Sequence, residues 1–339
     1  MLRATKIALL ALFSGLLLSA QTRDVIIDTD PGVDDSFALL IALHSPELKL
    51  HAITVVAGNV PLPVGLRNAL RLVEVSHRLD VPVAAGAAKP LKRKLFTATN
   101  VHGNDGMAGA KLPEATIHPV KETAVELIRR VVHANPKSVT IIAIGPLTNV
   151  AEALQSDPGL AAEIKQIVIM GGAIHGGNVT PVAEFNIYVD PEAARIVFLS
   201  GVPIVMSTWD ASQSVVLTPA LSVKIKPTQP GAIIAAAATA QAKGRDREGQ
   251  TMFDPVAVAA FLDPTLVTTQ KMYVDVETHG ELTAGQTVAY VAGPIRGSPL
   301  MDGQPGTEVR IAQFKPNVDV VIKVDAARFF ELFIDRLNR

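Results

Sequence analysis

Short β-branched runs alternate along this chain with amphipathic segments of helical length, and this alternation limits the fold more than any other feature. It is typical of a mostly parallel sheet with helices on both faces. With 339 residues, 48% of them apolar, the chain can bury one large core. We therefore expect a single α/β domain with a mostly parallel, doubly wound, Rossmann-like sheet. The expected strands are residues 25–27, 52–56, 139–144, 167–170, 204–207 and 318–324, and the expected helices are residues 36–44, 64–78, 122–132, 191–199, 254–261 and 326–337.

The charge balance argues against a nucleic-acid partner. The formal net charge is −1, and the short basic piece "KPLKRK" at residues 89–94 is not a sustained basic run. Neutralising phosphates requires clustered Lys and Arg. The chain has no cysteine, which excludes disulfides, thiolate metal sites and a cysteine nucleophile.

The first twenty residues have the pattern of a secretory signal. Arg3 and Lys6 precede an apolar run at residues 7–18, and Ser19 and Ala20 follow it. The run is too short to span a bilayer, and small residues at its end suit signal peptidase. We expect residues 1–20 to be a signal peptide and residues 21–339 to form the mature domain, exported to the periplasm or secreted, with no stable membrane span. An uncleaved anchor and a misassigned start are the alternatives.

Four aspartates are crowded into the stretch "DTDPGVDD" at residues 28–35. In a parallel sheet, ligands bind beyond the carboxyl ends of the strands, where this stretch follows the first expected strand. Crowded carboxylates raise one another's pKa unless a cation compensates, and oxygen ligands without a His or Cys cluster favour Ca²⁺ or Mg²⁺ over zinc. The alternative is that Asp34 and Asp35 only cap a helix beginning at Ser36.

Six segments together carry a family resemblance. They are similar to segments of the inosine-uridine preferring nucleoside hydrolases, a family of calcium-dependent enzymes that cleave the N-glycosidic bond of ribonucleosides. The resemblance covers essentially the whole mature chain, and it implies the nucleoside hydrolase type of α/β fold and a homo-oligomer, a dimer or a tetramer. The segments are "DTDPGVDDSFAL" at 28–39, "VVAGN" at 55–59, "HGNDG" at 102–106, "GPLTN" at 145–149, "VIMGGAIHGGNVTPVAEFNIYVDPEAARIVF" at 168–198 and "FDPVAVA" at 253–259.

The resemblance also implies roles for individual residues. Asp30 would be the general base that activates a Ca²⁺-bound water. Asp28 has no assigned role and is expected to support Asp30 or the adjoining turn. The implied Ca²⁺ ligands are the side chains of Asp30, Asp35 and Asp254 and the backbone carbonyl of Ile144. The implied ribose contacts are Asp34, Asn59, Asn178, Glu184 and Asn186, with Met170 under the sugar.

One position departs from the family pattern. Many members carry a histidine, thought to protonate the departing base, immediately before the aspartate at 254, and this chain has Phe253 there. Phenylalanine can stack or pack but cannot donate a proton. His102 and the charged stretch at residues 241–250 are the expected contributors near the base. A solvent-facing loop histidine is the alternative for His102.

Two other function classes compete with a nucleoside hydrolase. A haloacid-dehalogenase-type phosphatase also places a DxD after a strand, but the residues that follow Asp30 fit it poorly. A non-catalytic, Ca²⁺-dependent ribosyl-binding protein is conceivable because of Phe253 and the predicted export. The expected partner is a small-molecule ribonucleoside, and the sequence leaves its preferred base open.

Overall fold

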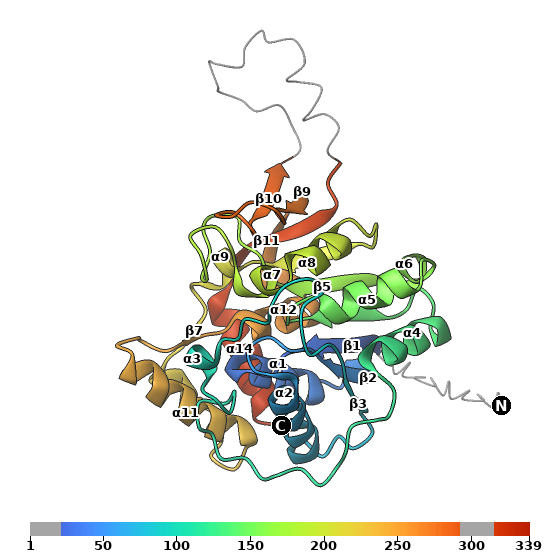
Figure 1. Cartoon of the computed structure of the whole chain (residues 1–339). Helices are drawn as coiled ribbons and strands as arrows, with labels where there is room; N and C mark the ends of the chain where they lie inside the picture. The colour runs from blue at the N-terminus through green and yellow to red at the C-terminus, as the bar shows by residue number, and fades with distance from the viewer. Residues whose placement is uncertain (1–21, 292–314) are drawn as a thin grey trace, which may run out of the picture.

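A nine-stranded sheet runs through the centre of the protein (Figure 1). The computed structural model describes residues 22–291 and 315–339. The predicted signal peptide at residues 1–20 lies outside these described residues. In the described part of the chain, no helix combines the length and the apolar character needed to cross a membrane.

The strands of this sheet follow the order β10-β9-β11-β6-β5-β4-β1-β2-β3. Across the sheet, each neighbouring pair from β11 through β6, β5, β4, β1 and β2 to β3 is parallel. Strand β9 is antiparallel to both of its neighbours, β10 and β11. Two further short strands, β7 (Val216–Leu217) and β8 (Gln250–Thr251), pair with each other. The strands of the large sheet are β1 (Arg23–Thr29), β2 (Leu48–Val55), β3 (Val83–Ala85), β4 (Thr140–Ala143), β5 (Gln166–Met170), β6 (Ile204–Ser207), β9 (Val267–Val276), β10 (Thr287–Val291) and β11 (Val318–Val324).

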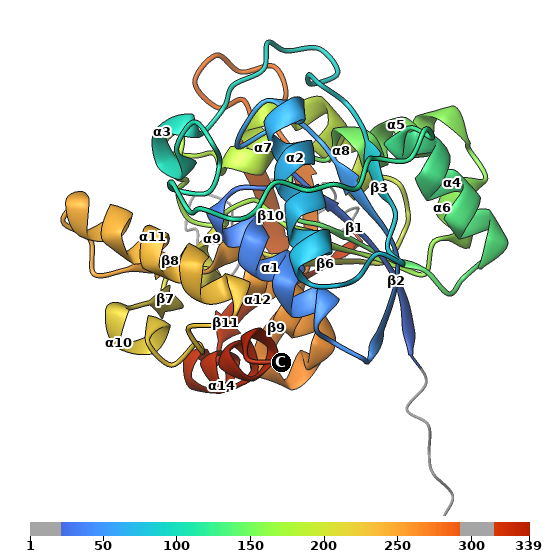
Figure 2. The same cartoon turned by 90° about the horizontal axis from the view of Figure 1, so that it is seen from below.

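Helices cover both faces of the sheet, as Figure 2 shows from below. Successive strand residues point to opposite faces. Val25 and Ile27 accordingly join one apolar cluster with Phe37, while Ile26 joins a second cluster with Phe198. The helices are α1 (Val33–Leu43), α2 (Leu62–Val75), α3 (Thr99–His102), α4 (Ala124–Ala134), α5 (Thr148–Ser156), α6 (Leu160–Glu163), α7 (Phe185–Val189), α8 (Pro191–Phe198), α9 (Trp209–Ser212), α10 (Pro219–Ser222), α11 (Pro230–Gly244), α12 (Phe253–Leu262), the 3₁₀ turn η1 (Pro264–Leu266) and α14 (Ala326–Leu337).

The strand order creates a switch point between β1 and β4. From β1 the chain proceeds outward to β2 and β3, and from β4 it proceeds in the other direction to β5 and β6. Loops therefore leave the carboxyl ends of these two adjacent strands in opposite directions, which opens a crevice for a ligand. The loop after β1 carries Asp30, and Ile144 follows β4.

The predicted fold class, a mostly parallel α/β sheet in one domain, is confirmed. The predicted start of the first helix was wrong: α1 begins at Val33, so Asp34 and Asp35 lie within its first turn and do not precede it. Similarly, α12 begins at Phe253, one residue before the predicted start. The structure also adds β3, the antiparallel strands β9 and β10, and α11, which the sequence pattern had not indicated.

Candidate active site

A cavity of about 630 Å³ opens at the carboxyl ends of the central strands. The first turns of α1 and α12, the loops after β2, β4 and β5, and α3 all contribute to its wall. Asp30 and Asp35 lie behind this wall and are fully buried. The residues with predicted roles that line the cavity are Asp34, Asn59, His102, Ile144, Met170, Asn178, Glu184, Asn186, Phe253 and Asp254.

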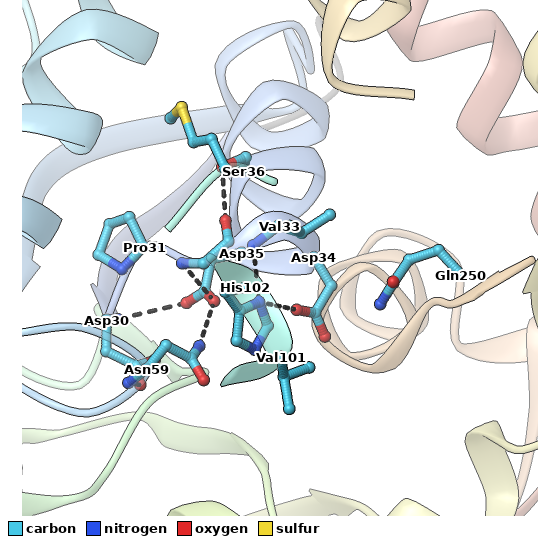
Figure 3. A network of polar contacts seen from close by, with 12 residues as sticks. Asp30, Pro31, Val33, Asp34, Asp35, Ser36, Asn59, Val101, His102 and Gln250 are labelled. Atoms are coloured by element: carbon cyan, nitrogen blue, oxygen red, sulfur yellow. Dashed lines mark hydrogen bonds and ion pairs between the residues drawn. The ribbon is translucent and has the colours of Figure 1, made fainter. Parts of the chain in front are cut away.

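Asp35 is the centre of the hydrogen-bond network drawn in Figure 3. Its Oδ1 accepts the Thr29 hydroxyl at 2.6 Å and the backbone N–H of Asp30 at 3.2 Å. Its Oδ2 accepts the N–H of Gly32 and the side-chain amide of Asn59, each at 2.9 Å. These four donors fix the carboxylate rigidly and tie the turn after β1 to the loop after β2.

Asp30 is held between two glycines. A Cβ on Gly58 would stand 2.1 Å from Oδ2 of Asp30, and one on Gly145 would stand 2.7 Å from Oδ1. Such approaches exclude any side chain at either position, which explains the glycines in "VVAGN" and "GPLTN". The backbone N–H of Asn59 donates to Asp30 Oδ2 at 2.6 Å, whereas Oδ1 is buried and has no hydrogen-bond partner among residues 22–291 and 315–339.

Carboxylate oxygens of Asp34, Asp35 and Asp254 lie within 4.8 Å of one another. Burial, reinforced by Asp35, raises the pKa of Asp34 to about 8, and burial followed by neighbouring carboxylates raises the pKa of Asp30 and Asp254 well above the usual range. In the part of the chain that the structure describes, Asp34 Oδ1, like Asp30 Oδ1, is buried without a hydrogen-bond partner. Buried carboxylates in this arrangement fit a hard divalent cation, which would relieve their repulsion.

The opposite side of the cavity presents amide and carboxylate groups. Asn186 donates its side-chain N–H groups to the carbonyls of Ile144 and Met170, each at 3.0 Å, and so links the ends of β4 and β5. Glu184 caps α7 by accepting the N–H groups of Gly172 at 2.9 Å and Ile187 at 3.3 Å. Burial raises the pKa of Glu184 to about 7.

His102 is buried, so the solvent-facing alternative for this residue was wrong. It ends α3, and its Nδ1 accepts the N–H of Val33 at 3.0 Å. Burial lowers the pKa of His102 to about 4, so the imidazole is neutral at pH 7. Because Nδ1 acts as an acceptor, the ring proton resides on Nε2. Phe253 lines the cavity and packs against the apolar core with its ring.

Several cavity residues were not singled out from the sequence. Trp209 begins α9 directly after β6, and Gln213 follows one turn later. Ligand-binding residues are expected just beyond the carboxyl ends of parallel strands. Trp209 lies at such a position after β6, so the same rule would have identified it. The charged stretch at 241–250 does reach the cavity, through Arg247, Glu248, Gly249 and Gln250, and the side chain of Gln250 faces Asp34 in Figure 3.

The comparison with known families decides the class of this site. The sequence profile of the family described as "Inosine-uridine preferring nucleoside hydrolase" matches residues 25–331. This chain belongs to that family. It is therefore a member of the N-ribosyl hydrolases, and neither the phosphatase nor the binding-protein alternative is favoured.

Curated relatives agree with the family assignment. This nucleoside hydrolase is 42% identical over 330 residues to the pyrimidine-specific ribonucleoside hydrolase RihA of Shigella flexneri serotype 5b, an alignment that covers 93% of this chain and 98% of RihA. The RihA of Escherichia coli O17:K52:H18 matches with the same identity and coverage.

Solved structures with the same fold are also nucleoside hydrolases. The plant nucleoside hydrolase PpNRh1 superposes with a TM-score of 0.83 at 35% identity, covering 93% of this chain and 99% of that chain. The purine-preferring ribonucleoside hydrolase of Gardnerella vaginalis superposes with a TM-score of 0.83 at 31% identity, covering 93% and 98%.

In this nucleoside hydrolase, Asp28 does not contact Asp30 through its side chain. Its Oδ1 accepts the Thr54 hydroxyl at 2.5 Å and the Asn149 amide at 2.7 Å. Asn149 in turn accepts the N–H of Ala87 at 2.8 Å. The side chain of Asp28 thus ties β1 to β2 and α5, and its expected support of Asp30 or the adjoining turn stays a prediction. Burial raises the pKa of Asp28 to about 7.

Proposed function

We propose that this protein hydrolyses the N-glycosidic bond of ribonucleosides to ribose and free base. The observation that carries the proposal is the group of four buried aspartates, of which Asp34 and Asp254 line the cavity and Asp30 and Asp35 lie behind its wall, opposite a wall of amide and carboxylate groups. Departure of the base leaves an oxocarbenium-like ribosyl group, and carboxylates next to it stabilise the developing positive charge.

The proposed cofactor is Ca²⁺. Asp30, Asp35, Asp254 and the carbonyl of Ile144 would hold it, and Asp34 lies close enough to Asp35 and Asp254 to contribute charge. The buried carboxylate oxygens without partners among the described residues favour a cation here, and the absence of cysteine from the sequence favours a hard cation over a thiolate-bound metal. When bound, such a cation lowers the pKa of water and binds sugar hydroxyls.

Asp30 is the proposed general base. Asn59 occupies its Oδ2, so Oδ1 is the atom free to take a proton from the attacking water. Burial and the charge on Asp35 raise the pKa of Asp30 in the Ca²⁺-free protein, and a bound cation would lower it again, so that the carboxylate is ionised and can act as a base. The close approach of Gly58 and Gly145 to its two oxygens packs the carboxylate between the loops after β2 and β4.

Ribose recognition is proposed for the polar residues of the wall, with Met170 under the sugar. Hydrogen bonds to the hydroxyl groups would orient the sugar, and a deoxyribose would leave a buried acceptor unpaired, which costs affinity. The residues proposed to bind the hydroxyls are Asp34, Asn59, Asn178, Glu184 and Asn186.

Residue 253 offers no acid that could protonate the leaving group. Phe253 can only pack against the base, whereas His102 carries a proton on Nε2 and lines the same cavity. We assign His102 a hydrogen bond to the departing base. Its low pKa means that it acts as a neutral donor, because the imidazolium is scarcely populated at pH 7.

A pyrimidine preference is proposed because the RihA proteins, named pyrimidine-specific, share 42% identity with this chain. The test is the release of free base from uridine, cytidine, inosine and adenosine by the mature protein in millimolar Ca²⁺. We expect kcat/KM for uridine or cytidine to exceed that for either purine nucleoside by about tenfold or more. A preference for inosine would refute the pyrimidine assignment, and no release from any of the four would refute the hydrolase proposal.

Two further proposals concern the mature protein as a whole. We propose that it begins near Gln21 and is exported, and that it assembles as a homo-oligomer. N-terminal sequencing of the protein from the extracytoplasmic fraction tests the first, since an intact Met1 would contradict it. Light scattering tests the second, for which a monomeric mass would be the contrary result.

A further inference from the structure

The loop between β5 and α7, residues 171–184, carries two of the proposed sugar-binding residues, Glu184 next to α7 and Asn178 in the middle of the loop. Asn178 lies near its tip and lines the cavity, and we find no hydrogen bond of its side-chain amide with the described residues. A loop side chain binds a ligand well only when the loop itself is held in place. What holds this loop therefore decides how well Asn178 can act.

Asp210, in the first turn of α9, holds this loop from outside through two hydrogen bonds. Its Oδ2 accepts the N–H of Ile174 at 2.6 Å, and its Oδ1 accepts the N–H of His175 at 2.9 Å. Across residues 174–180, these are the two hydrogen bonds that we find to groups outside the loop in the described chain. The backbone N–H groups of residues 178–180 bond within the loop, to the carbonyl of Ala183.

Asp210 is itself well anchored. The residue before α9, Thr208, donates its hydroxyl to the carbonyl of Val321 at 3.0 Å and accepts the N–H of Ala211 at 3.2 Å. The backbone N–H of Trp209 donates to the carbonyl of Gly172 at 2.9 Å. The start of α9 is thus fixed to both β11 and the beginning of the loop.

Trp209 adds a second contact to the same loop. Its indole lies 3.8 Å from the position that a Cβ on Gly176 would take, and it also lines the cavity. It is the one tryptophan of the chain. Its fluorescence therefore reports on this part of the cavity without interference from another indole.

We propose that Asp210 is a positioning residue for substrate binding, which acts by clamping the loop so that Asn178 faces the sugar. The proposal rests on the proposed function, because it takes a ribonucleoside as the ligand. Asp210 does not itself line the cavity. Its effect on the substrate must therefore pass through the loop, and this requirement separates positioning from direct binding.

A double-mutant cycle on the Ca²⁺-loaded protein tests this coupling. Asp210→Ala and Asn178→Ala are each expected to raise KM for uridine about tenfold and to change kcat less than about threefold, because each loses one well-placed hydrogen bond to the sugar. Asp210→Ala should add no more than about twofold in an Asn178→Ala background, because the loop then carries no amide to position. Independent, multiplicative effects would overturn the proposal, as would an unchanged KM in Asp210→Ala.

Two further variants test whether the change in KM reflects a general loss of folding. Asp210→Asn keeps one acceptor for the two N–H groups, so its KM should lie between those of wild type and Asp210→Ala. Glu277→Ala removes a carboxylate that likewise accepts two successive N–H groups, those of His279 and Gly280, in a turn without cavity residues. It should leave KM unchanged, and a KM effect equal to that of Asp210→Ala would overturn the proposal.

Quenching of Trp209 fluorescence by uridine provides a readout that does not depend on turnover. Asp210→Ala should raise the dissociation constant for uridine about tenfold, in parallel with KM. If uridine binds but no base is released, the hydrolase proposal fails, and the same cycle measured on the dissociation constant still tests Asp210. Equal dissociation constants for wild type and Asp210→Ala would refute the positioning role.

Discussion

Asn59 donates its backbone N–H to one oxygen of Asp30 at 2.6 Å, and the other oxygen, Oδ1, is buried without a hydrogen-bond partner in the described residues. A buried acceptor without a donor costs stability and is retained where a ligand or a proton is to be received. The unpaired oxygen supports Asp30 in the role of base that the family resemblance implies for it.

Asp30→Asn is therefore expected to lower kcat for uridine by at least about 10²-fold, since a positioned base contributes about 10²–10⁴-fold and loss of a cation ligand adds to the effect. The same change should raise the melting temperature of the Ca²⁺-free protein near neutral pH, because it removes a carboxyl group that burial and Asp35 force to take up a proton on folding. Asp24→Asn, at the far end of β1, is the control for folding. Turnover near that of wild type in a folded Asp30→Asn protein would remove Asp30 from the mechanism.

Ca²⁺ should raise the melting temperature of wild type. A ligand that binds the native state alone stabilises it by about 2.7 kcal/mol at a concentration one hundred times its dissociation constant. Asp254→Ala should abolish the response, whereas Asp263→Ala, outside the cavity on the exposed turn after α12, should retain it. A wild-type melting curve that millimolar Ca²⁺ leaves unchanged would count against the proposed Ca²⁺ site.

The stability of the Ca²⁺-free protein should fall as pH rises. Asp34 has a pKa of about 8 in the fold against 3.8 as an ordinary aspartate, and Asp28 and Glu184 have pKa values of about 7. Each group binds a proton more tightly when folded, so its contribution is complete below about pH 4 and is lost as pH rises toward 8. Thermal unfolding between pH 5 and 9 checks this, and Asp34→Asn should flatten the slope. A melting temperature that rises over this range in both proteins would contradict the assignment.

Phe253→His should change the leaving-group dependence. A nitrophenolate departs without a proton, whereas a nucleobase is helped by one, so wild type should cleave p-nitrophenyl riboside with a much higher kcat/KM than inosine. Histidine at 253 should narrow that gap, and Phe253→Leu, which packs but cannot donate, should not. If wild type handles both substrates equally, another group already supplies the proton, and His102→Ala becomes the deciding variant.

The sequence predicted the central strands well because they are buried on both faces. Ile26 and Ile27, for example, pack into opposite clusters, so the strand is a continuous apolar run with a clear local signal. The antiparallel strand β9 is mostly half-exposed and mixes polar with apolar residues, and α11 is a run of alanines without a distinct polar face. In β9 the buried alternation is confined to residues 272–276, and α11 has no amphipathic period, so neither gave a signal over its full length.

Within the site, prediction from sequence succeeded where function follows a strand end and failed where burial depends on distant contacts. Asp30, Asn59 and Ile144 all lie next to strand ends, and the fold brings them to one crevice. His102 is buried because a four-residue helix places it against Val33, a contact 69 residues away in the chain. No local pattern encodes such a contact.

The most direct test of the central claim is ribose release from uridine by the mature protein after exhaustive chelation, before and after Ca²⁺ is returned. The account predicts cleavage that chelation abolishes, that Ca²⁺ restores, and that Asp30→Asn does not recover at any Ca²⁺ concentration. Cleavage that is equally fast with chelator, or that Asp30→Asn supports at the wild-type rate, would contradict it.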